Sequence, residues 1–250
     1  MPGTAIVTGA SSGIGRESAI ALAKAGYNVV ITARRQDALE ETKGLCPPDA
    51  QKRVLVLPGD IVDEPFVKSL FEETVNKFGR LDLLFNNAGV NSKALPLEEI
   101  PLETFQNIMA VNVVGPFLCT REAIRLFKHQ TPQGGRIVNN GSISAHVPRP
   151  FAASYTASKH AITGLSKSTS LEGRDFGITC TTLDIGNAAT ALTERMDSGV
   201  PQPDGSNKVE PTFDVMHVGA AIVYLAGLPP DVNVPHFMIM ANQMPFAGRG

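Results

Sequence analysis

The sequence contains little cysteine, which limits the kinds of fold that it can support. Three cysteines occur in 250 residues, at Cys46, Cys119 and Cys180, and no two of them form a Cys-x-x-Cys pair. A disulfide framework needs several pairs of cysteines, and an odd number leaves at least one thiol unpaired. We therefore expect reduced thiols in a cytoplasmic protein.

The histidines are also few and show no metal-ligand spacing. There are five in the chain. His146 follows Ser142 by four residues and could line the pocket, but we interpret it as a solvated loop residue. His129, His217 and His236 show no ligand spacing. The sequence therefore predicts no metal site.

An excess of charge of one sign is missing as well. Lysine and arginine total 22 against 24 aspartates and glutamates, a net charge of −2. Chains that hold nucleic acid or an anionic membrane usually carry a clear basic excess. The sequence therefore argues against nucleic acid and membrane as partners.

Long apolar runs are absent too. The most apolar segment, residues 218–228, is far shorter than the roughly 18 residues of a membrane-spanning helix, and Pro229 and Pro230 follow it. No basic segment followed by an apolar stretch marks the N-terminus as a secretion signal. We interpret residues 218–228 as part of a buried amphipathic helix.

Segments with the pattern of strands alternate with segments of helical periodicity, and no internal repeat interrupts them. The predicted strands are residues 4–8, 28–33, 53–57, 81–85, 135–140, 178–183 and 236–241. The predicted helices are residues 13–25, 36–45, 64–78, 102–127, 154–176 and 214–227. Gly115 and Pro116 are expected to bend the helix over 102–127.

This alternation builds βαβ units, which place a parallel sheet between two layers of helices. No linker divides the chain, so we predict one α/β domain over residues 1–250. Its fold is a Rossmann-type, doubly wound parallel sheet of about seven strands with helices on both faces. The one long connection, residues 186–213, follows the sixth strand at the ligand-binding edge, and we predict that it borders the substrate.

A glycine-rich turn follows the first predicted strand, where residues 8–15 read Thr-Gly-Ala-Ser-Ser-Gly-Ile-Gly. Glycine lets the backbone approach a pyrophosphate closely, and the N–H groups at a helix N-terminus bind anions. A turn that merely closes a βα unit would look similar, but the position between strand and helix favours a dinucleotide site. The predicted contacts are Gly9, Ser11, Ser12, Gly13, Ile14 and Gly15.

The end of the second strand indicates which dinucleotide binds. An acidic residue there would bind the 2′-hydroxyl of NAD, but the run is Thr32-Ala33-Arg34-Arg35. Arginine suits a phosphate group, so we predict NADP(H), with Arg34 as the main contact and Arg35 as the weaker one. The alternative is that both arginines are solvated loop residues.

Three polar positions in the second half suggest acid–base chemistry. Tyr155 and Lys159 are four residues apart in a predicted helix and share one face. The lysine charge favours the ionised phenol, as a general acid and base requires, although such a pair also arises easily by chance. Ser142 follows the fifth strand at the edge where ligands bind.

Together these motifs resemble those of the short-chain dehydrogenase/reductase family, from residue 4 to about residue 190. The matching parts are residues 8–15, Asp60, residues 86–89, Asn112, Ser142, Tyr155 and Lys159.

The resemblance implies a role for each residue. Tyr155 would donate a proton to the carbonyl oxygen of a ketone as NADPH gives its hydride, or accept that proton in the reverse direction. Lys159 would assist Tyr155 and bind the nicotinamide ribose. Ser142 would polarise the carbonyl, and Asn112 would hold a water that links Lys159 to solvent. The further cofactor contacts that it implies are Asp60, Ile61, Asn87, Ala88, Gly89, Gly186 and Thr190.

The resemblance also implies a homotetramer or dimer, joined through the helices that contain Asn112 and Tyr155. Two features depart from the family pattern. Ile185 replaces the usual proline before Gly186, so a different position is expected for the loop that follows. The chain also ends without the usual glycine-rich strand end. We therefore do not assign the substrate of the best-known fatty-acyl reductases to this chain.

The leading hypothesis is an NADP(H)-dependent oxidoreductase that interconverts a secondary alcohol and a ketone. The alternative is a catalytically inactive NADP-binding sensor or structural protein, which has no need of the Tyr155–Lys159 pair. An epimerase or dehydratase is a third reading, which the length of 250 residues disfavours because it leaves little room for a substrate domain.

Overall fold

Seven parallel strands form the central sheet of the protein, in the order β11-β6-β5-β4-β1-β2-β3. The computed structural model describes residues 3–190 and 199–246. The strands are β1 (Thr4–Thr8), β2 (Asn28–Thr32), β3 (Val54–Val56), β4 (Leu83–Asn86), β5 (Gly135–Asn140), β6 (Ile178–Ile185) and β11 (His236–Ile239). The predicted Rossmann-type sheet is thereby confirmed.

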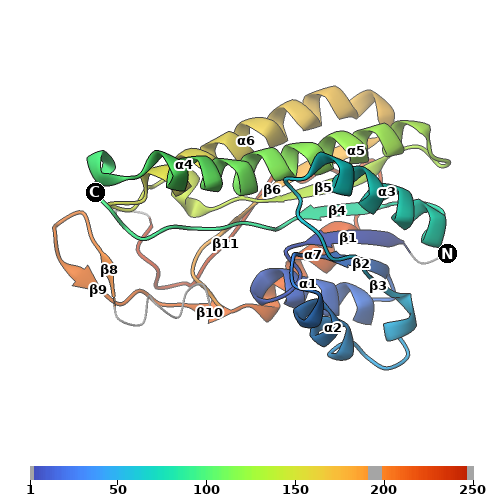
Figure 1. Ribbon diagram of the computed structural model, residues 1–250, viewed down its shortest axis with the longest axis horizontal. Helices are drawn as coiled ribbons and strands as arrows, with labels where there is room; N and C mark the ends of the chain where they lie inside the picture. The colour runs from blue at the N-terminus through green and yellow to red at the C-terminus, as the bar shows by residue number, and fades with distance from the viewer. Residues whose placement is uncertain (1–2, 191–198, 247–250) are drawn as a thin grey trace.

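Helices cover both faces of this sheet (Figure 1). One layer contains α1 (Gly13–Lys24), α2 (Gln36–Gly44) and α7 (Met216–Ala226). The other contains α3 (Glu64–Phe78), α4 (Leu102–Met109), α5 (Gly115–His129) and α6 (Ala153–Gly173). None of the helices within residues 3–190 and 199–246 has both the length and the apolarity needed to cross a bilayer.

Each strand contributes to two separate hydrophobic cores, because successive side chains point to opposite faces of a sheet. In β1, Ala5 and Val7 pack beneath the layer of α1 and α7, whereas Ile6 packs beneath the layer of α3 and α5. This double burial explains why the central positions of β1, β2 and β4 are apolar on both faces. It also holds the carboxyl ends of the strands at one fixed edge.

The helix predicted over residues 102–127 is interrupted. A π-helical segment, η3 (Ala110–Val114), lies between α4 and α5, just before the Gly115-Pro116 pair that was expected to bend the helix. Pro116 has no N–H to donate to the carbonyl of residue 112, so the regular hydrogen-bond ladder cannot continue there. The irregular turn contains Asn112, which is buried.

The connection over residues 186–213, predicted as one long loop, contains short strands that the sequence analysis did not predict. β7 (Ala188–Ala189) pairs with β10 (Phe213–Asp214), and β8 (Val200–Pro201) pairs with β9 (Asn207–Lys208). Residues 191–198 of this connection lie outside the described residues. β6 itself continues to Ile185, which pairs with Ile239.

Candidate active site

A cavity of about 670 Å³ opens along the carboxyl-terminal edge of the sheet. Nearly every residue predicted to contact a cofactor lines it. These residues are Gly9, Ser11, Ser12, Gly13, Ile14, Arg34, Arg35, Asp60, Ile61, Asn87, Ala88, Gly89, Tyr155, Lys159, Gly186 and Thr190. Gly15, Asn112 and Ser142 are the predicted site residues that do not line it. The volume is in the range of ligand-binding pockets.

The glycine-rich turn is closed by contacts that only glycine allows. Gly9 has a φ of 66°, and a Cβ atom on it would lie 2.7 Å from the Cα atom of Ala88. A Cβ atom on Gly15 would lie 2.4 Å from the carbonyl oxygen of Gly9. Gly15 therefore allows α1 to pack closely against the turn and does not itself line the cavity. The turn directs the N-terminus of α1 toward the cavity. No acidic residue occupies the first turn of α1, so the end of the helix suits an anion.

Asn87 connects this turn to Lys159 through a chain of hydrogen bonds. Its Nδ2 donates to the Thr8 carbonyl at 2.9 Å, and its Oδ1 accepts from Asn140 Nδ2 at 3.0 Å. The Asn140 carbonyl in turn accepts from Lys159 Nζ at 2.7 Å. Sequence analysis did not identify Asn140, because the lysine contacts its backbone and no side-chain motif marks that contact.

Tyr155 and Lys159 lie on the same face of α6, as the four-residue spacing predicts. Lys159 Nζ is 5.4 Å from the centroid of the Tyr155 ring. Lys159 is buried, whereas Tyr155 is only partly buried and borders the cavity. The phenol therefore lies at the cavity with a fixed positive charge behind it.

Asn112 ties the segment after β4 to α6. Its Oδ1 accepts from the Val90 N–H at 2.8 Å, and its Nδ2 donates to the Val90 carbonyl at 2.9 Å. The same Nδ2 is 3.0 Å from Ser158 Oγ, which donates to the Tyr155 carbonyl at 2.7 Å. These bonds support the backbone of the helix that carries Tyr155. The water that the resemblance places between Asn112 and Lys159 stays a prediction.

Ser142 is held by Asp184, a residue that sequence analysis did not assign to the site. The Ser142 N–H donates to Asp184 Oδ1 at 2.7 Å, and Ser142 Oγ accepts from the Ser144 N–H at 3.1 Å. Asp184 is fully buried at the end of β6. The available signal was a carboxylate near the end of a strand that contains no other charged residue.

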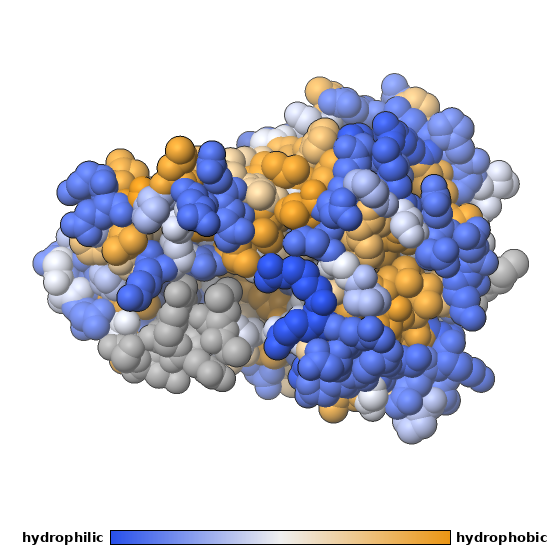
Figure 2. Space-filling view, in the orientation of Figure 1, coloured by the Kyte–Doolittle hydropathy of each residue, from blue (hydrophilic) through white to orange (hydrophobic). Residues whose placement is uncertain are grey.

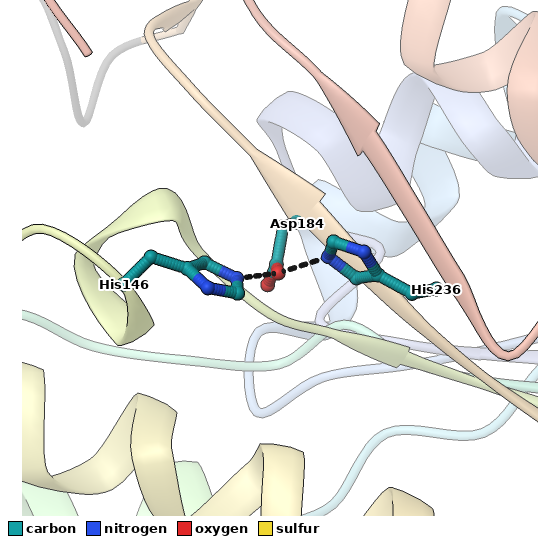
Figure 3. A group of neighbouring side chains, drawn as sticks. All are labelled: His146, Asp184 and His236. Carbon is teal, nitrogen blue, oxygen red and sulfur yellow. Dashed lines mark hydrogen bonds and ion pairs between the residues drawn. The ribbon is translucent and has the colours of Figure 1, made fainter. Parts of the chain in front are cut away.

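The second oxygen of Asp184 contacts two histidines (Figure 3). His146 Nε2 lies 2.6 Å from Asp184 Oδ2, and His236 Nε2 lies 2.7 Å from the same atom. His146 is exposed and lies in the turn after η4, as its interpretation as a solvated loop residue predicts, but that interpretation did not foresee the contact with Asp184. The two rings are also neighbours, with centroids 5.4 Å apart.

Arg34 and Arg35 are exposed and border the cavity beside Asp60 and Ile61. Among the residues that the structure describes, neither arginine forms an ion pair with an acidic side chain. The Asp60 carboxylate forms a hydrogen bond within its own turn, where its Oδ1 accepts from the Val62 N–H at 3.1 Å. Both guanidinium groups are therefore available to an anionic ligand.

Comparison with known proteins agrees with this arrangement. The family model for short chain dehydrogenases matches residues 3–200. The chain is 35% identical over 202 residues to a 3beta-hydroxysteroid dehydrogenase of Mediterraneibacter gnavus, with coverage of 78% of this chain and 69% of that protein.

Two solved structures share the whole fold. A 3-ketoacyl-(acyl-carrier-protein) reductase from Brucella melitensis, complexed with NADH, has a TM-score of 0.84 at 29% identity, covering 96% of this chain and 98% of that chain. An alcohol dehydrogenase from the archaeon Thermococcus sibiricus, complexed with 5-hydroxy-NADP, has a TM-score of 0.81 at 25% identity, with 98% of each chain covered. Sequence, fold and cavity thus lead to one conclusion: the chain is an oxidoreductase that belongs to the short-chain dehydrogenase/reductase family.

Proposed function

We propose that the protein is an NADP(H)-dependent oxidoreductase that interconverts a secondary alcohol and a ketone. The observation that carries the proposal is the position of Tyr155 at the cavity, with the buried ammonium of Lys159 5.4 Å from its ring. An inactive NADP-binding sensor has no use for a phenol and a charge placed in this way. Catalysis by proton transfer requires both.

The cavity fits a nicotinamide dinucleotide along its length. Gly9 and the N-terminus of α1 border the cavity at the glycine-rich turn. Arg34 and Arg35 border it beside Asp60, and neither is in an ion pair within the part of the chain that the structure describes. These groups suit a pyrophosphate and a 2′-phosphate respectively. When bound, the dinucleotide supplies a hydride to the substrate carbon or takes one from it.

In this proposal, residues of the chain itself transfer the proton. Tyr155 donates its phenolic proton to the carbonyl oxygen during reduction and accepts the alcohol proton during oxidation. Lys159 stabilises the phenolate through its charge. That ammonium is held in place by the carbonyl of Asn140, 2.7 Å away.

Ser142 orients the carbonyl of the substrate. Its Oγ already accepts a hydrogen bond from the Ser144 N–H at 3.1 Å, so its own proton remains available for the substrate oxygen. The bond from its N–H to the buried Asp184 fixes the backbone at this position. We expect the described parts of residues 186–213 to border the same substrate, whose identity a panel of ketones and alcohols will define.

The three cysteines are free, buried thiols, which supports a cytoplasmic location because thiols stay reduced there. We also propose a homo-oligomer, a tetramer or a dimer. Large hydrophobic side chains are exposed on α4, η3 and α5, namely Leu102, Phe105, Val114 and Phe117. Figure 2 shows hydrophobic surface where Figure 1 places the junction of α4 and α5.

Replacement of Tyr155 by Phe tests the catalytic proposal. The variant lacks the transferable proton, so we expect kcat to fall by about 10³-fold, while NADPH binding followed by fluorescence stays near the wild-type value. Tyr224→Phe is the matched control, because Tyr224 is exposed on α7. Full turnover by Tyr155→Phe on the substrates that the wild type accepts would overturn the assignment.

A further inference from the structure

Three residues that take no part in the proton transfer form a cluster beside Ser142. His146 follows β5, Asp184 ends β6 and His236 begins β11, and all three side chains point toward one another (Figure 3). We propose that this cluster binds a divalent transition-metal ion of the zinc type. The proposal stands independently of the oxidoreductase activity, because its ligands are not in the cofactor cavity.

The ligand atoms have the chemistry that such an ion prefers. The cluster offers one nitrogen from each imidazole and one carboxylate oxygen, all within 4.8 Å of one another. Two histidines and one carboxylate bind Zn²⁺ or Fe²⁺ in proteins and leave coordination positions open for water. Mg²⁺ and Ca²⁺ are poorer candidates, since they prefer oxygen ligands throughout.

The spacing can accommodate an ion after a small movement. The two nitrogens lie 2.6 Å and 2.7 Å from Asp184 Oδ2, whereas tetrahedral bonds of about 2.1 Å place neighbouring ligand atoms about 3.4 Å apart. Each imidazole must therefore move away from this oxygen by about 0.7–0.8 Å. Both have room, because the side chains of His146 and His236 are 37% and 46% exposed.

The burial of Asp184 is the second observation that points to a cation. Its side chain is 1% exposed, and its ion-pair partners within the described chain are His146 and His236. Buried carboxylates in proteins are paired with cations or coordinate metal ions.

The surroundings of the cluster hold the Asp184 carboxylate in place. Asp184 Oδ1 accepts from the Ser142 N–H at 2.7 Å, a bond that holds the carboxylate so that Oδ2 faces the imidazoles. Phe246 lies edge-on to His146, with ring centroids 6.4 Å apart, in an apolar cluster with Met244. An ion here would therefore restrain the backbone of Ser142 and the ends of three strands.

Metal titration of the intact chain, with any purification tag removed, tests the proposal. Protein treated with a chelator is titrated with Zn²⁺ by calorimetry, and separately with Co²⁺ while the visible d–d absorption is recorded. We expect one Zn²⁺ per chain, a Co²⁺ spectrum of low coordination number, and a melting temperature several degrees higher with Zn²⁺.

The ligand variants are His146→Ala and His236→Ala, whose exposed positions favour folding, as circular dichroism will verify. Each should lose at least about 100-fold in Zn²⁺ affinity, because removal of even an outer-shell partner costs 10- to 100-fold. His217→Ala is the matched control, since His217 is exposed on α7. Binding far below one equivalent, or wild-type binding by both ligand variants, would refute the site. None of these readouts depends on substrate turnover.

Discussion

The ammonium of Lys159 donates to a backbone carbonyl, that of Asn140, at 2.7 Å. Among the described residues no acidic side chain pairs with it, so its positive charge lies unneutralised beside Tyr155. Burial raises the pKa of the Cys119 and Cys180 thiols to about 12. Both thiols therefore stay protonated near neutral pH.

Arg34 decides the cofactor in our proposal, and Arg34→Ala tests that role. A charge-assisted bond to a phosphate contributes about 1.5–3 kcal/mol, so NADPH affinity should fall by about 10- to 100-fold. NADH affinity should change little, because NADH carries no 2′-phosphate. Arg35→Ala is the control and should have a smaller effect. Both affinities are measured by fluorescence titration, and equal use of NADH and NADPH by the wild type would contradict the NADP assignment.

The segment between β7 and β10 is anchored through a buried glutamate. Glu210 is 3% exposed and forms an ion pair with Arg149. Asn187 Nδ2 donates to it at 2.9 Å, and Gln202 Nε2 donates at 3.1 Å. Burial opposes ionisation of Glu210, but the bond from Asn187 and the charge of Arg149 outweigh it and hold the pKa of Glu210 below its usual range. These contacts hold Glu210 in place on one side of the predicted substrate region.

Glu210→Gln should destabilise the fold by about 3 kcal/mol, because it leaves the guanidinium of Arg149 buried without its counter-charge. Urea unfolding at neutral pH measures this loss. The lowered pKa means that the ionised form contributes fully above the unfolded pKa of about 4.3 and is lost as pH falls through the folded value. The difference between wild type and variant should therefore shrink in acid.

The control for this prediction removes both charges. The double variant Arg149→Gln with Glu210→Gln should be less destabilised than the sum of the single variants, since the charge of Arg149 is removed together with that of Glu210. If Glu210→Gln unfolds at the wild-type urea concentration, the ion pair does not anchor this segment.

At the scale of the whole molecule, the apolar surface of α4, η3 and α5 stands out because it is exposed to water in the single chain. Leu102 is 70% exposed and Phe117 is 46% exposed on this surface. Contiguous hydrophobic surface of this kind usually marks a contact with another protein. A second copy of the chain would cover it and would also restrain the irregular turn that contains Asn112.

Phe117→Glu should therefore dissociate the assembly, because a buried interface does not accept an uncompensated charge. Light scattering after size exclusion should give two or four times the chain mass of 26.6 kDa for the wild type, and a single chain mass for the variant. Leu45→Glu is the control, since Leu45 is 53% exposed beside α2, away from this surface. A monomeric wild type at micromolar concentration would refute the oligomer.

Local patterns in the sequence were enough to predict which segments form strands and helices, where the glycine-rich turn of residues 8–15 lies, and that Tyr155 and Lys159 share one helix face. Each depends on residues within one strand, turn or helix, where side-chain periodicity and glycine chemistry act over a few positions. The same reasoning located the long connection after β6 but not its short strands, because β7 pairs with β10 across residues that are distant in the chain.

Only the tertiary structure could bring Asp184 to Ser142 and place His146 and His236 on its other oxygen. These histidines are 38 and 52 residues from Asp184 in the sequence, so no motif of fixed spacing joins them. They meet because β5, β6 and β11 are neighbours in the sheet, and the order of the strands is decided by packing across the whole domain. The bond from Lys159 to the Asn140 carbonyl has the same origin, since any residue type at position 140 would present that oxygen.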